Sequence, residues 1–235
     1  STANTPAFGV NPATIESFSS YGNGSQFFYN DSGIAYASAI PLSPVFAAAV
    51  DNVATTVPGG LSDFYGTSAA SASMAGAIAA MLAAAPNLTP YEVQLLIQQS
   101  TVGTSGTSSV AGAGLLQIDT AVANANAYAA TGQHQSAVYA GQAATAKIVS
   151  SSNTLVVLSA ATAGGTVVQA AGTQSVYGTT SNTIVNSGGV LIVNSAGTDR
   201  NSTVNSGGSV VVTSLGTVSG ATISSGGSIF LSSGG

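Results

Sequence analysis

The longest apolar run of the chain lies in its first half, between Met74 and Ala85. It consists mostly of alanine with a few larger apolar residues, and a single glycine, Gly76, interrupts it. A stretch that is apolar on all sides, without the alternation of a strand, is typical of a buried helix. The run is also shorter than the roughly 18 apolar residues that a membrane-spanning helix requires. The pattern therefore predicts a core helix, with Ser68 near its start.

Polar residues mark the start of a second helix. Thr89 precedes Pro90, a residue favoured at the first helical position, and Glu92 follows Thr89 by three positions, as in a capping box. The apolar residues that follow recur at helical spacing: Val93, Leu96 and Ile97. This face is expected to pack on the first helix.

A stretch rich in Gly, Ser and Thr, residues 101–111, predicts a loop between the second helix and a third. Asp119 is expected to be the N-cap of this third helix, which would run from Thr120 to about Ala130. Val122 and Ala125 would lie on its inward face.

From about Ala137 the period of the pattern changes, and an internal repeat is visible from Asn182 onward. Glycine pairs recur every 19 residues: Gly188-Gly189, Gly207-Gly208 and Gly226-Gly227. Three apolar columns keep the same interval: Val185, Val204, Ile223; Leu191, Val210, Ile229; and Val193, Val212, Leu231. Short apolar runs between glycine turns at such a period are typical of a solenoid. We therefore predict a parallel β-helix with coils about 4.8 Å apart, apolar columns inside, and positive φ in the Asn-Ser-Gly-Gly turns.

A shift in composition indicates two architectures. All seven prolines lie at or before Pro90 and six of the seven phenylalanines at or before Phe64, whereas Gly, Ser, Thr, Val and Asn dominate afterwards. We predict an α/β domain over residues 1–130, a linker over 131–146 and β-helical repeats over 147–235, in degenerate form before residue 182. The uncharged start, from Ser1 to Asn4, does not read as a signal peptide, and we expect the chain to be an excerpt from a longer one.

Composition also restricts the function classes. Charged residues make up only 4% of the chain, far below the quarter typical of soluble domains, which favours an extracellular or surface location. The net charge of -5, with Lys147 and Arg200 as the two basic residues, leaves no basic patch for nucleic acid or an anionic membrane. The absence of cysteine excludes disulfides and thiolate zinc sites. Asp31 and Asp51 are separated acids, which cap turns more often than they bind calcium, so we expect no metal and no cofactor.

Ser68 is the candidate catalytic residue. A serine just before an apolar run is most often an N-cap, whose side chain accepts a backbone N–H of the first turn. The second interpretation is a nucleophile, because a helix N-terminus offers free N–H groups and partial positive charge to an anion formed beside it. In that case the N–H of Ser68 itself would help to hold the oxyanion.

The stretch from Gly66 to Gly76, GTSAASASMAG, resembles the nucleophile segment of the subtilisin-like serine peptidases, whose pattern is roughly GTSxAxPHVAG. Ala72 and Ser73 depart from this pattern, because that family has Pro and His there. Flanking segments extend the resemblance over roughly residues 10 to 128. Glu16 to Gly22 is similar to the family's SFSSxG turn, and Pro44 to Ala48 is similar to its PDxxAPG segment in eroded form. Pro86 to Val93 resembles the start of the family's next helix, and Gly112 to Asp119 resembles its closing strand and helix.

The resemblance implies a serine endopeptidase of partial α/β fold that acts on peptides or proteins, with Ser68 as nucleophile and the Ser68 N–H as an oxyanion donor. In that family the catalytic Asp, His and an oxyanion Asn precede the serine, and no histidine precedes Ser68 here. Either the missing residues lie outside this chain or the protein is a degenerate relative, and the intact Gly66-Thr67-Ser68 favours the first account. A convergent triad of Ser68, Asp119 and His134, the only histidine, is a lesser alternative, because His134 lies in the expected linker. We expect the 235-residue chain alone to be inactive.

The 19-residue repeat is similar to the passenger repeats of bacterial autotransporter adhesins, clearly so over residues 182–235. This resemblance implies display at the bacterial cell surface, an outer-membrane β-barrel in the full-length chain, and a cell-surface ligand as a further candidate partner. Together the two resemblances predict a secreted, surface-displayed subtilisin-like endopeptidase of autotransporter type. The alternative is a catalytically inactive structural or adhesive passenger protein.

Overall fold

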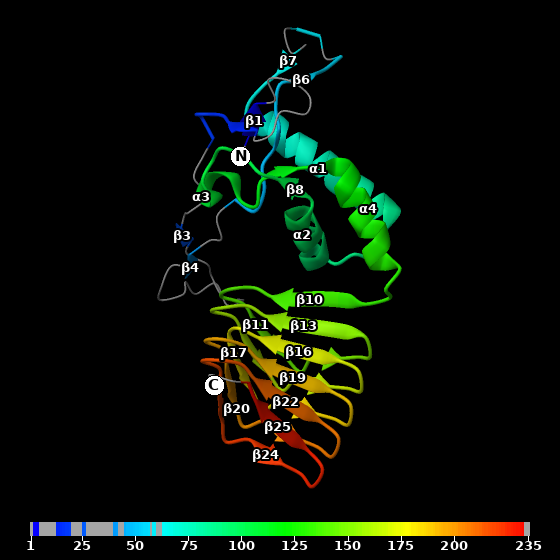
Figure 1. Ribbon diagram of the computed structural model, residues 1–235, viewed down its shortest axis with the longest axis vertical. Coiled ribbons are helices and arrows are strands. Elements are labelled where there is room, and N and C mark those ends of the chain that lie inside the picture. The colour runs from blue at the N-terminus through cyan, green and yellow to red at the C-terminus, as the bar shows by residue number, and fades with distance from the viewer. Residues whose placement is uncertain are drawn as a thin grey trace. The chain divides into compact units, whose positions relative to one another are not determined.

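The computed structural model describes residues 2–4, 13–19, 25–26, 40–41, 45–56, 58–59 and 63–232 (Figure 1). The chain divides into two compact units, Ser1–Thr131 and Gly132–Gly235. The first combines helices with short strands, and the second is a parallel β-helix. The fold class expected from the sequence, α/β followed by a β-helical solenoid, is therefore confirmed.

The first two predicted helices are present. α1 spans Thr67–Ala84 and α2 spans Pro90–Gln99. The capping box of α2 is complete, because the Glu92 N–H donates to Thr89 Oγ1 at 3.2 Å and the Thr89 N–H donates to Glu92 Oε2 at 2.6 Å. The Tyr128 hydroxyl donates a further hydrogen bond to Glu92 Oε1 at 3.0 Å. The Thr89 N–H and the Tyr128 hydroxyl, which both donate to the carboxylate, explain how Glu92 is tolerated in a buried position.

Two details of the helix prediction are wrong. Segment 101–111, expected to be a loop, contains strand β8 (Thr101–Val102) and a short helix α3 (Ser108–Ala111). The third long helix, α4, spans Ile118–Ala129, so its N-cap is Gln117, and Asp119 lies in its first turn. Strand β9 (Leu115–Leu116) pairs with β8 and holds the chain extended until just before α4, which is why the helix begins at Ile118.

Short strands complete the first unit. Their bounds are β1 (Thr2–Asn4), β2 (Thr14–Ile15), β3 (Ser25–Gln26), β4 (Ile40–Pro41), β5 (Ala49–Val50), β6 (Val53–Ala54) and β7 (Asp63–Phe64). β1 pairs antiparallel with β2 and parallel with β5. Ala48, next to β5, forms a parallel bridge with Leu115 of β9. β3 pairs with β4, and β6 with β7, which leads into α1.

The core of the first unit lies where α1, α2 and α4 meet. Met81 of α1 and Ile97 of α2 are fully buried there, together with Ala121 and Ala125 of α4. α1 contributes only one face to this core, since 22% of its residues are buried. By length and composition alone this helix would also suffice to cross a membrane. The predicted core helix is therefore covered on one side only by the residues that the structure describes.

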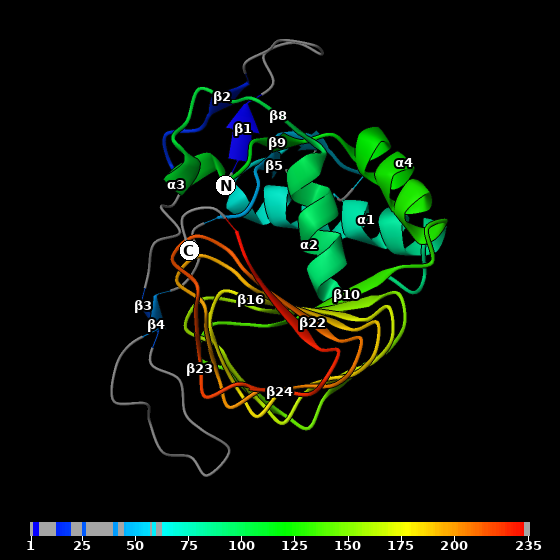
Figure 2. The ribbon, with the colours of Figure 1, turned by 60° about the horizontal axis from the view of Figure 1, so that its bottom comes forward.

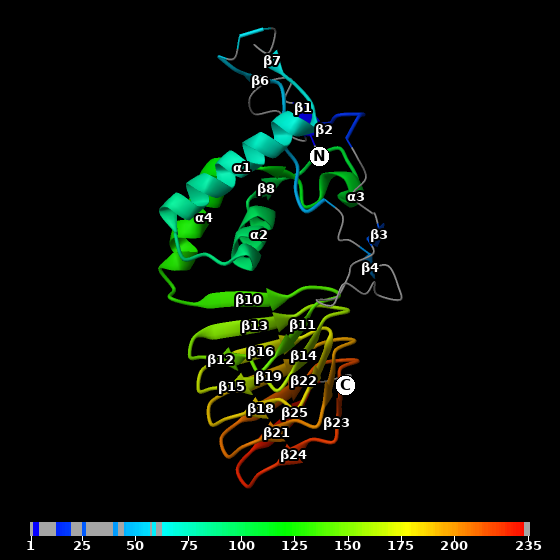
Figure 3. The same ribbon diagram turned by 180° about the vertical axis from the view of Figure 1, so that it is seen from behind.

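The second unit is built from three parallel sheets whose coils overlie one another (Figures 2 and 3). The first sheet holds β10 (His134–Val138), β13 (Asn153–Val157), β16 (Thr173–Val176), β19 (Val190–Val193), β22 (Ser209–Val212) and β25 (Ser228–Leu231). The second holds β11 (Ala143–Thr145), β14 (Thr162–Gly164), β17 (Thr179–Ser181), β20 (Thr198–Arg200) and β23 (Thr217–Ser219). The third holds β12 (Ile148–Val149), β15 (Val167–Val168), β18 (Ile184–Val185), β21 (Thr203–Val204) and β24 (Thr222–Ile223). Five coils thus contribute one short strand to each sheet, and β25 adds a sixth strand to the first sheet.

One coil is shorter than the others. Thr154 pairs with Thr173 and Val190 with Ser209, both at an interval of 19 residues, whereas Thr173 pairs with Val190 at an interval of 17. The two residues that this coil lacks are missing from the turn between β16 and β17, which contains only Tyr177 and Gly178. This shortened turn explains why the sequence repeat is visible only from Asn182 onward.

The predicted linker, residues 131–146, is wrong. It contains strands β10 and β11, which pair with β13 and β14. The solenoid therefore begins near His134, two strands earlier than the sequence pattern indicated. The reason is that backbone pairing requires an extended chain but no particular side chain, so a coil of Ala, Gln and Ser can stack without the glycine signature.

The predicted apolar columns fill the interior of the solenoid except in the last coil, where Ile223 and Leu231 are exposed. Val149, Val168, Val185 and Val204 lie one above another on the third sheet, each almost completely buried. In the turns Gly188, Gly207 and Gly226 have φ of 74°, 76° and 85°, which confirms the predicted positive φ. Amide side chains extend the stacking outside the strands, because Asn205 Nδ2 donates to Asn186 Oδ1 at 2.9 Å.

Substitutions at two neighbouring residues of β19 test which side chains of this strand face the interior of the solenoid. Leu191 is fully buried, whereas Ile192 points to the other face and is only partly buried. We expect Leu191→Ala to lower the free energy of unfolding by about 2–5 kcal/mol, since it leaves a cavity in the interior. The matched Ile192→Ala change should cost about 1 kcal/mol or less. Urea denaturation followed by circular dichroism measures both, and equal losses would contradict the register.

Candidate functional site

The start of α1 is defined by a glycine turn. Gly66 is the N-cap, with φ 98° and ψ 179°, and no side chain caps the helix. A positive φ of this size favours glycine, because it has no Cβ. Ser68 is the second residue of the helix and its side chain is exposed. The interpretation of Ser68 as an N-cap is therefore wrong, and its hydroxyl is not committed to capping.

Asp51 holds this turn in place. Its side chain is buried, with 4% of its surface exposed, and Asp51 Oδ2 accepts a hydrogen bond from the Gly66 N–H at 3.1 Å. On the other side of the turn the N–H groups of Ala69 and Ala70 donate to the Gly66 carbonyl at 3.0 and 3.1 Å. Asp51 thus caps a turn, as one of the two sequence interpretations stated, and Asp31 lies outside the described residues.

The amide of Ser68 points to no acceptor in the part of the chain that the structure describes. This follows from helix geometry, since the first N–H groups of a helix have no partner within it. The same end of α1 carries partial positive charge from the helix dipole, and its first turn holds no acidic residue. An exposed hydroxyl and an uncommitted amide of the same residue therefore lie together at a weakly positive helix end.

A groove of about 410 Å³ runs beside this part of α1. Its apolar lining includes Phe46, Met74 and Ile78, and Thr67 and Ser71 add hydroxyl groups. Ser68 is not among the lining residues, so its side chain lies on the neighbouring face of the helix.

The proposed partners of Ser68 within the chain gain no support. Asp119 is exposed in the first turn of α4. His134 is not in a linker but in β10, where it pairs with Asn153 in the second unit. Among the described residues no group of three or more His, Asp or Glu side chains gathers that could hold a metal ion. The role of Ser68 as a nucleophile therefore stays a prediction.

A second polar cluster lies inside the solenoid, and sequence reasoning missed it. Its members are buried: Thr166, Gln174, Thr180, Thr183, Asp199 and Ser202. Gln174 Nε2 donates to Thr166 Oγ1 at 3.3 Å, and Thr183 Oγ1 donates to Gln174 Oε1 at 3.4 Å. Gln174 stands where the neighbouring coils carry Leu155 and Leu191, and this break in an apolar column is the signal that could have revealed the cluster.

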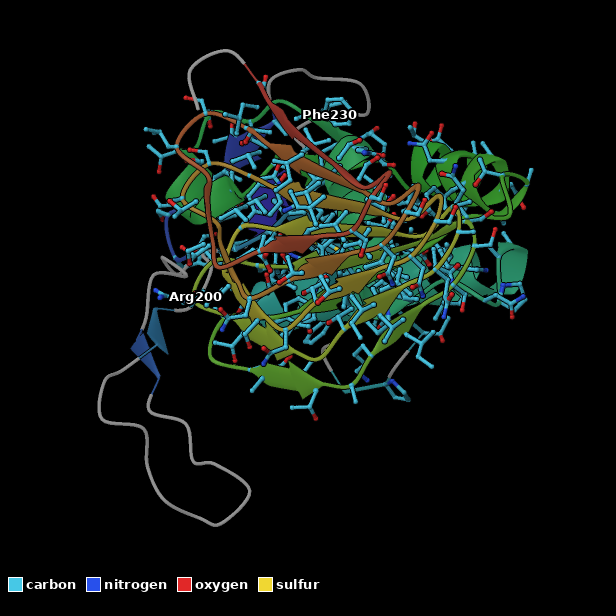
Figure 4. The ribbon with its side chains drawn as sticks, turned by 90° about the horizontal axis from the view of Figure 1, so that it is seen from below. Arg200 and Phe230 are labelled. Atoms are coloured by element: carbon cyan, nitrogen blue, oxygen red, sulfur yellow. The ribbon has the colours of Figure 1, made fainter. Side chains whose placement is uncertain are left out.

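Asp199 is the only acid among the buried side chains described in the solenoid. Thr180 Oγ1 donates to Asp199 Oδ1 at 2.8 Å. The next residue, Arg200, points out of the coil, away from this interior (Figure 4). Burial raises the pKa of Asp199, while the Ser202 and Thr180 hydroxyls and the Arg200 backbone oppose that rise. Burial is the largest of these effects, so the pKa of Asp199 lies above its ordinary value in the folded solenoid.

Comparison with known protein families agrees with this division. Residues 9–114 match the profile described as "Subtilase family", and residues 175–227 match the profile described as "Adhesin of bacterial autotransporter system, probable stalk". Both resemblances inferred from the sequence are thereby confirmed over these residues. No curated protein matches the chain.

One solved structure similar to the chain is a fragment of TibA that is hyper-glycosylated by TibC. The two share 30% sequence identity at a TM-score of 0.41, over 42% of this chain and 36% of the TibA fragment. This chain thus spans little more than a third of that fragment.

The buried acid makes the stability of the solenoid depend on pH. The pKa of Asp199 is raised in the folded state, so the stability it contributes is present at low pH and is lost as the pH rises through the folded pKa. Asp199→Asn removes the ionisable group, so we expect its stability not to fall as the pH rises. Its free energy of unfolding should exceed that of the wild type most clearly near neutral pH. Urea midpoints measured between about pH 4 and pH 8 test this. The exposed Asp63→Asn serves as control, and an identical pH profile for wild type and Asp199→Asn would contradict the assignment.

Proposed function

We propose that the first unit is part of a subtilisin-like serine endopeptidase in which Ser68 is the nucleophile and the Ser68 N–H an oxyanion donor. The observation that carries the proposal is the exposed hydroxyl and uncommitted amide of Ser68 at the N-terminus of α1, within the region that matches the subtilase profile. The other members of the catalytic machinery lie outside these 235 residues.

Hydrolysis of a peptide bond at this site would take three steps. Ser68 Oγ attacks the carbonyl carbon of a peptide bond while a base removes its proton and later delivers that proton to the leaving amine. The carbonyl oxygen becomes an anion, which the Ser68 N–H and the positive end of α1 stabilise. Water then releases the acyl group. The first unit contains no histidine, so the base must come from another part of the protein.

The second unit acts as a stalk in this proposal. Its coils share backbone hydrogen bonds along three sheets, which makes a stiff rod suited to holding a domain away from a membrane. The match to the autotransporter stalk profile supports a bacterial cell-surface location and an outer-membrane β-barrel as the membrane partner. Proteins or peptides would be the substrates.

A second candidate function is a structural or adhesive passenger protein without activity. The observation that favours it is the departure from the peptidase pattern at Ala72 and Ser73, next to an eroded segment at Pro44 to Ala48. In that case the solenoid faces, rather than Ser68, would bind a cell-surface ligand.

Labelling with a fluorophosphonate probe distinguishes the two. We expect the longer natural protein to be labelled at Ser68 and the 235-residue chain to remain unlabelled. Ser68→Ala should abolish labelling and lower peptide hydrolysis by roughly four to six orders of magnitude. Ser71→Ala, which removes another exposed hydroxyl one turn along the same helix, is the matched control and should keep most of the activity.

Two results would contradict the proposal. Labelling of the 235-residue chain would show that no outside base is needed. A longer protein that is folded but unlabelled would favour the passenger without activity.

A further inference from the structure

One corner of the solenoid is interrupted at a single coil. In four coils the turn from the first sheet to the second has four residues. The third residue of each of these turns has a positive φ of 77°, 61°, 64° and 64°: Gly141, Ala160, Ala196 and Leu215. In the coil of β16 the same turn contains only Tyr177 and Gly178, so no residue takes this position. The corner therefore lacks one layer between Ala160 and Ala196, and we call this break the Ala160–Ala196 gap.

The gap leaves two backbone groups that point toward the same coil. In the coils on either side the turn residues are joined by hydrogen bonds, because the Gly141 N–H donates to the Ala160 carbonyl at 2.9 Å and the Ala196 N–H donates to the Leu215 carbonyl at 3.2 Å. The same pattern directs the Ala160 N–H and the Ala196 carbonyl toward the coil of β16. Neither group has a hydrogen-bond partner in the part of the chain that the structure describes.

The corner between the second and third sheets shows that the break is local. There the Gly165 N–H donates to the Ser181 carbonyl at 2.9 Å, and the Asn182 N–H donates to the Arg200 carbonyl at 2.8 Å. This ladder passes through the coil of β16 and β17 without interruption. The shortened coil thus opens its stack at one corner only.

The gap has the dimensions of one extended chain. Ala160 and Ala196 lie two coils apart, or about 9.6 Å at about 4.8 Å per coil, so one chain segment fits between them. A trans peptide group carries its C=O and its N–H on opposite sides. Such a group can therefore accept a hydrogen bond from the Ala160 N–H and donate one to the Ala196 carbonyl at the same time.

The surroundings of the gap indicate the character of its ligand. Tyr177 has 44% of its surface exposed and lies beside the gap, where its ring offers an apolar contact. Gly178 closes the floor, because a Cβ there would clash with the carbonyl oxygens of Leu158 and Ala161. The residues that border the gap are uncharged: Ser159, Ala160, Tyr177, Gly178, Ser195 and Ala196. A neutral ligand is favoured over a charged one.

We propose that the Ala160–Ala196 gap binds an extended, uncharged peptide segment of a partner protein, which restores the hydrogen-bond ladder at this corner. Main-chain hydrogen bonds supply the affinity, as they do when a strand is added to an open sheet edge. Tyr177 contacts an apolar side chain of the segment. The stalk is then a recognition element in its own right, and this role does not depend on Ser68.

A two-residue insertion provides the matched control. Inserting Ser-Ala between Tyr177 and Gly178 gives the turn four residues and copies Ser195-Ala196 of the next coil. The insertion supplies the missing N–H and C=O from within the chain, so the gap is filled. Amide hydrogen exchange at Ala160 and Ala196 is followed by NMR in the 235-residue chain, with and without the blocked peptide Ac-Val-Thr-Val-NHMe.

The peptide is expected to act at Ala160 alone. Without it, the Ala160 N–H should exchange at least about tenfold faster than the Ala196 N–H, which has an acceptor in Leu215. Saturating peptide should slow exchange at Ala160 by at least about tenfold and leave Ala196 unchanged. In the insertion variant Ala160 should be protected from the start. Tyr177→Ala keeps the gap but removes the ring, so it should raise the Kd of the peptide by about two- to tenfold.

Three results would overturn the proposal. Exchange at Ala160 as slow as at Ala196 in the free protein would mean that the gap is closed. Exchange at Ala160 that the peptide leaves unchanged would mean that water alone occupies the gap. Protection by N-acetylglucosamine and not by the peptide, or protection that grows with protein concentration, would identify a sugar or a second copy of the chain as the occupant. If the insertion variant does not fold, the exchange rates of the wild type and the Kd of Tyr177→Ala decide the question.

Discussion

The turn at Gly66 is the constraint on which the candidate site depends. Its positive φ lets the chain leave β7 and enter α1 without a side chain that would cap the helix. The buried carboxylate of Asp51 fixes the turn through the Gly66 N–H. Because the cap position is filled by a residue without a side chain, the hydroxyl of Ser68 stays exposed and the Ser68 amide keeps no partner among the described residues. The exposure of this hydroxyl and amide is thus a consequence of backbone geometry.

Local sequence signals predicted those elements whose geometry is set locally. The capping box of Thr89 and Glu92 needs only four consecutive residues, and α2 starts where it indicates. The start of α4 depends instead on the pairing of β8 with β9, and Asp119, a good N-cap by type, lies inside the helix. The contact between Asp51 and Gly66 spans 15 residues and leaves no local pattern, so the role of Asp51 could be named only as one of two alternatives.

The solenoid shows the same division between local and long-range signals. Its period is readable because Gly207 and its equivalents must adopt positive φ at the same place in each coil. The coils before Asn182 carry Ser152 and Ala171 instead of glycine at this positive-φ position, and one coil is two residues shorter, yet they pair in the same three sheets. Backbone hydrogen bonding therefore tolerates changes in sequence and in turn length that hide the repeat, and the first coil was mistaken for a linker.

Asp199 shows how far this tolerance extends. In its column the neighbouring coils carry Thr180 and Val218, so stacking does not require an acid there. A carboxyl fits because Thr180 is a hydrogen-bond donor in the coil before and the pocket is already polar at Ser202. In the protonated form the acid is no more costly to bury than an amide such as Gln174, which the same interior accepts. The interior of this β-helix therefore accepts polar groups as well as apolar ones where another side chain supplies a hydrogen-bond partner, as Thr180 does for Asp199 and Thr166 for Gln174.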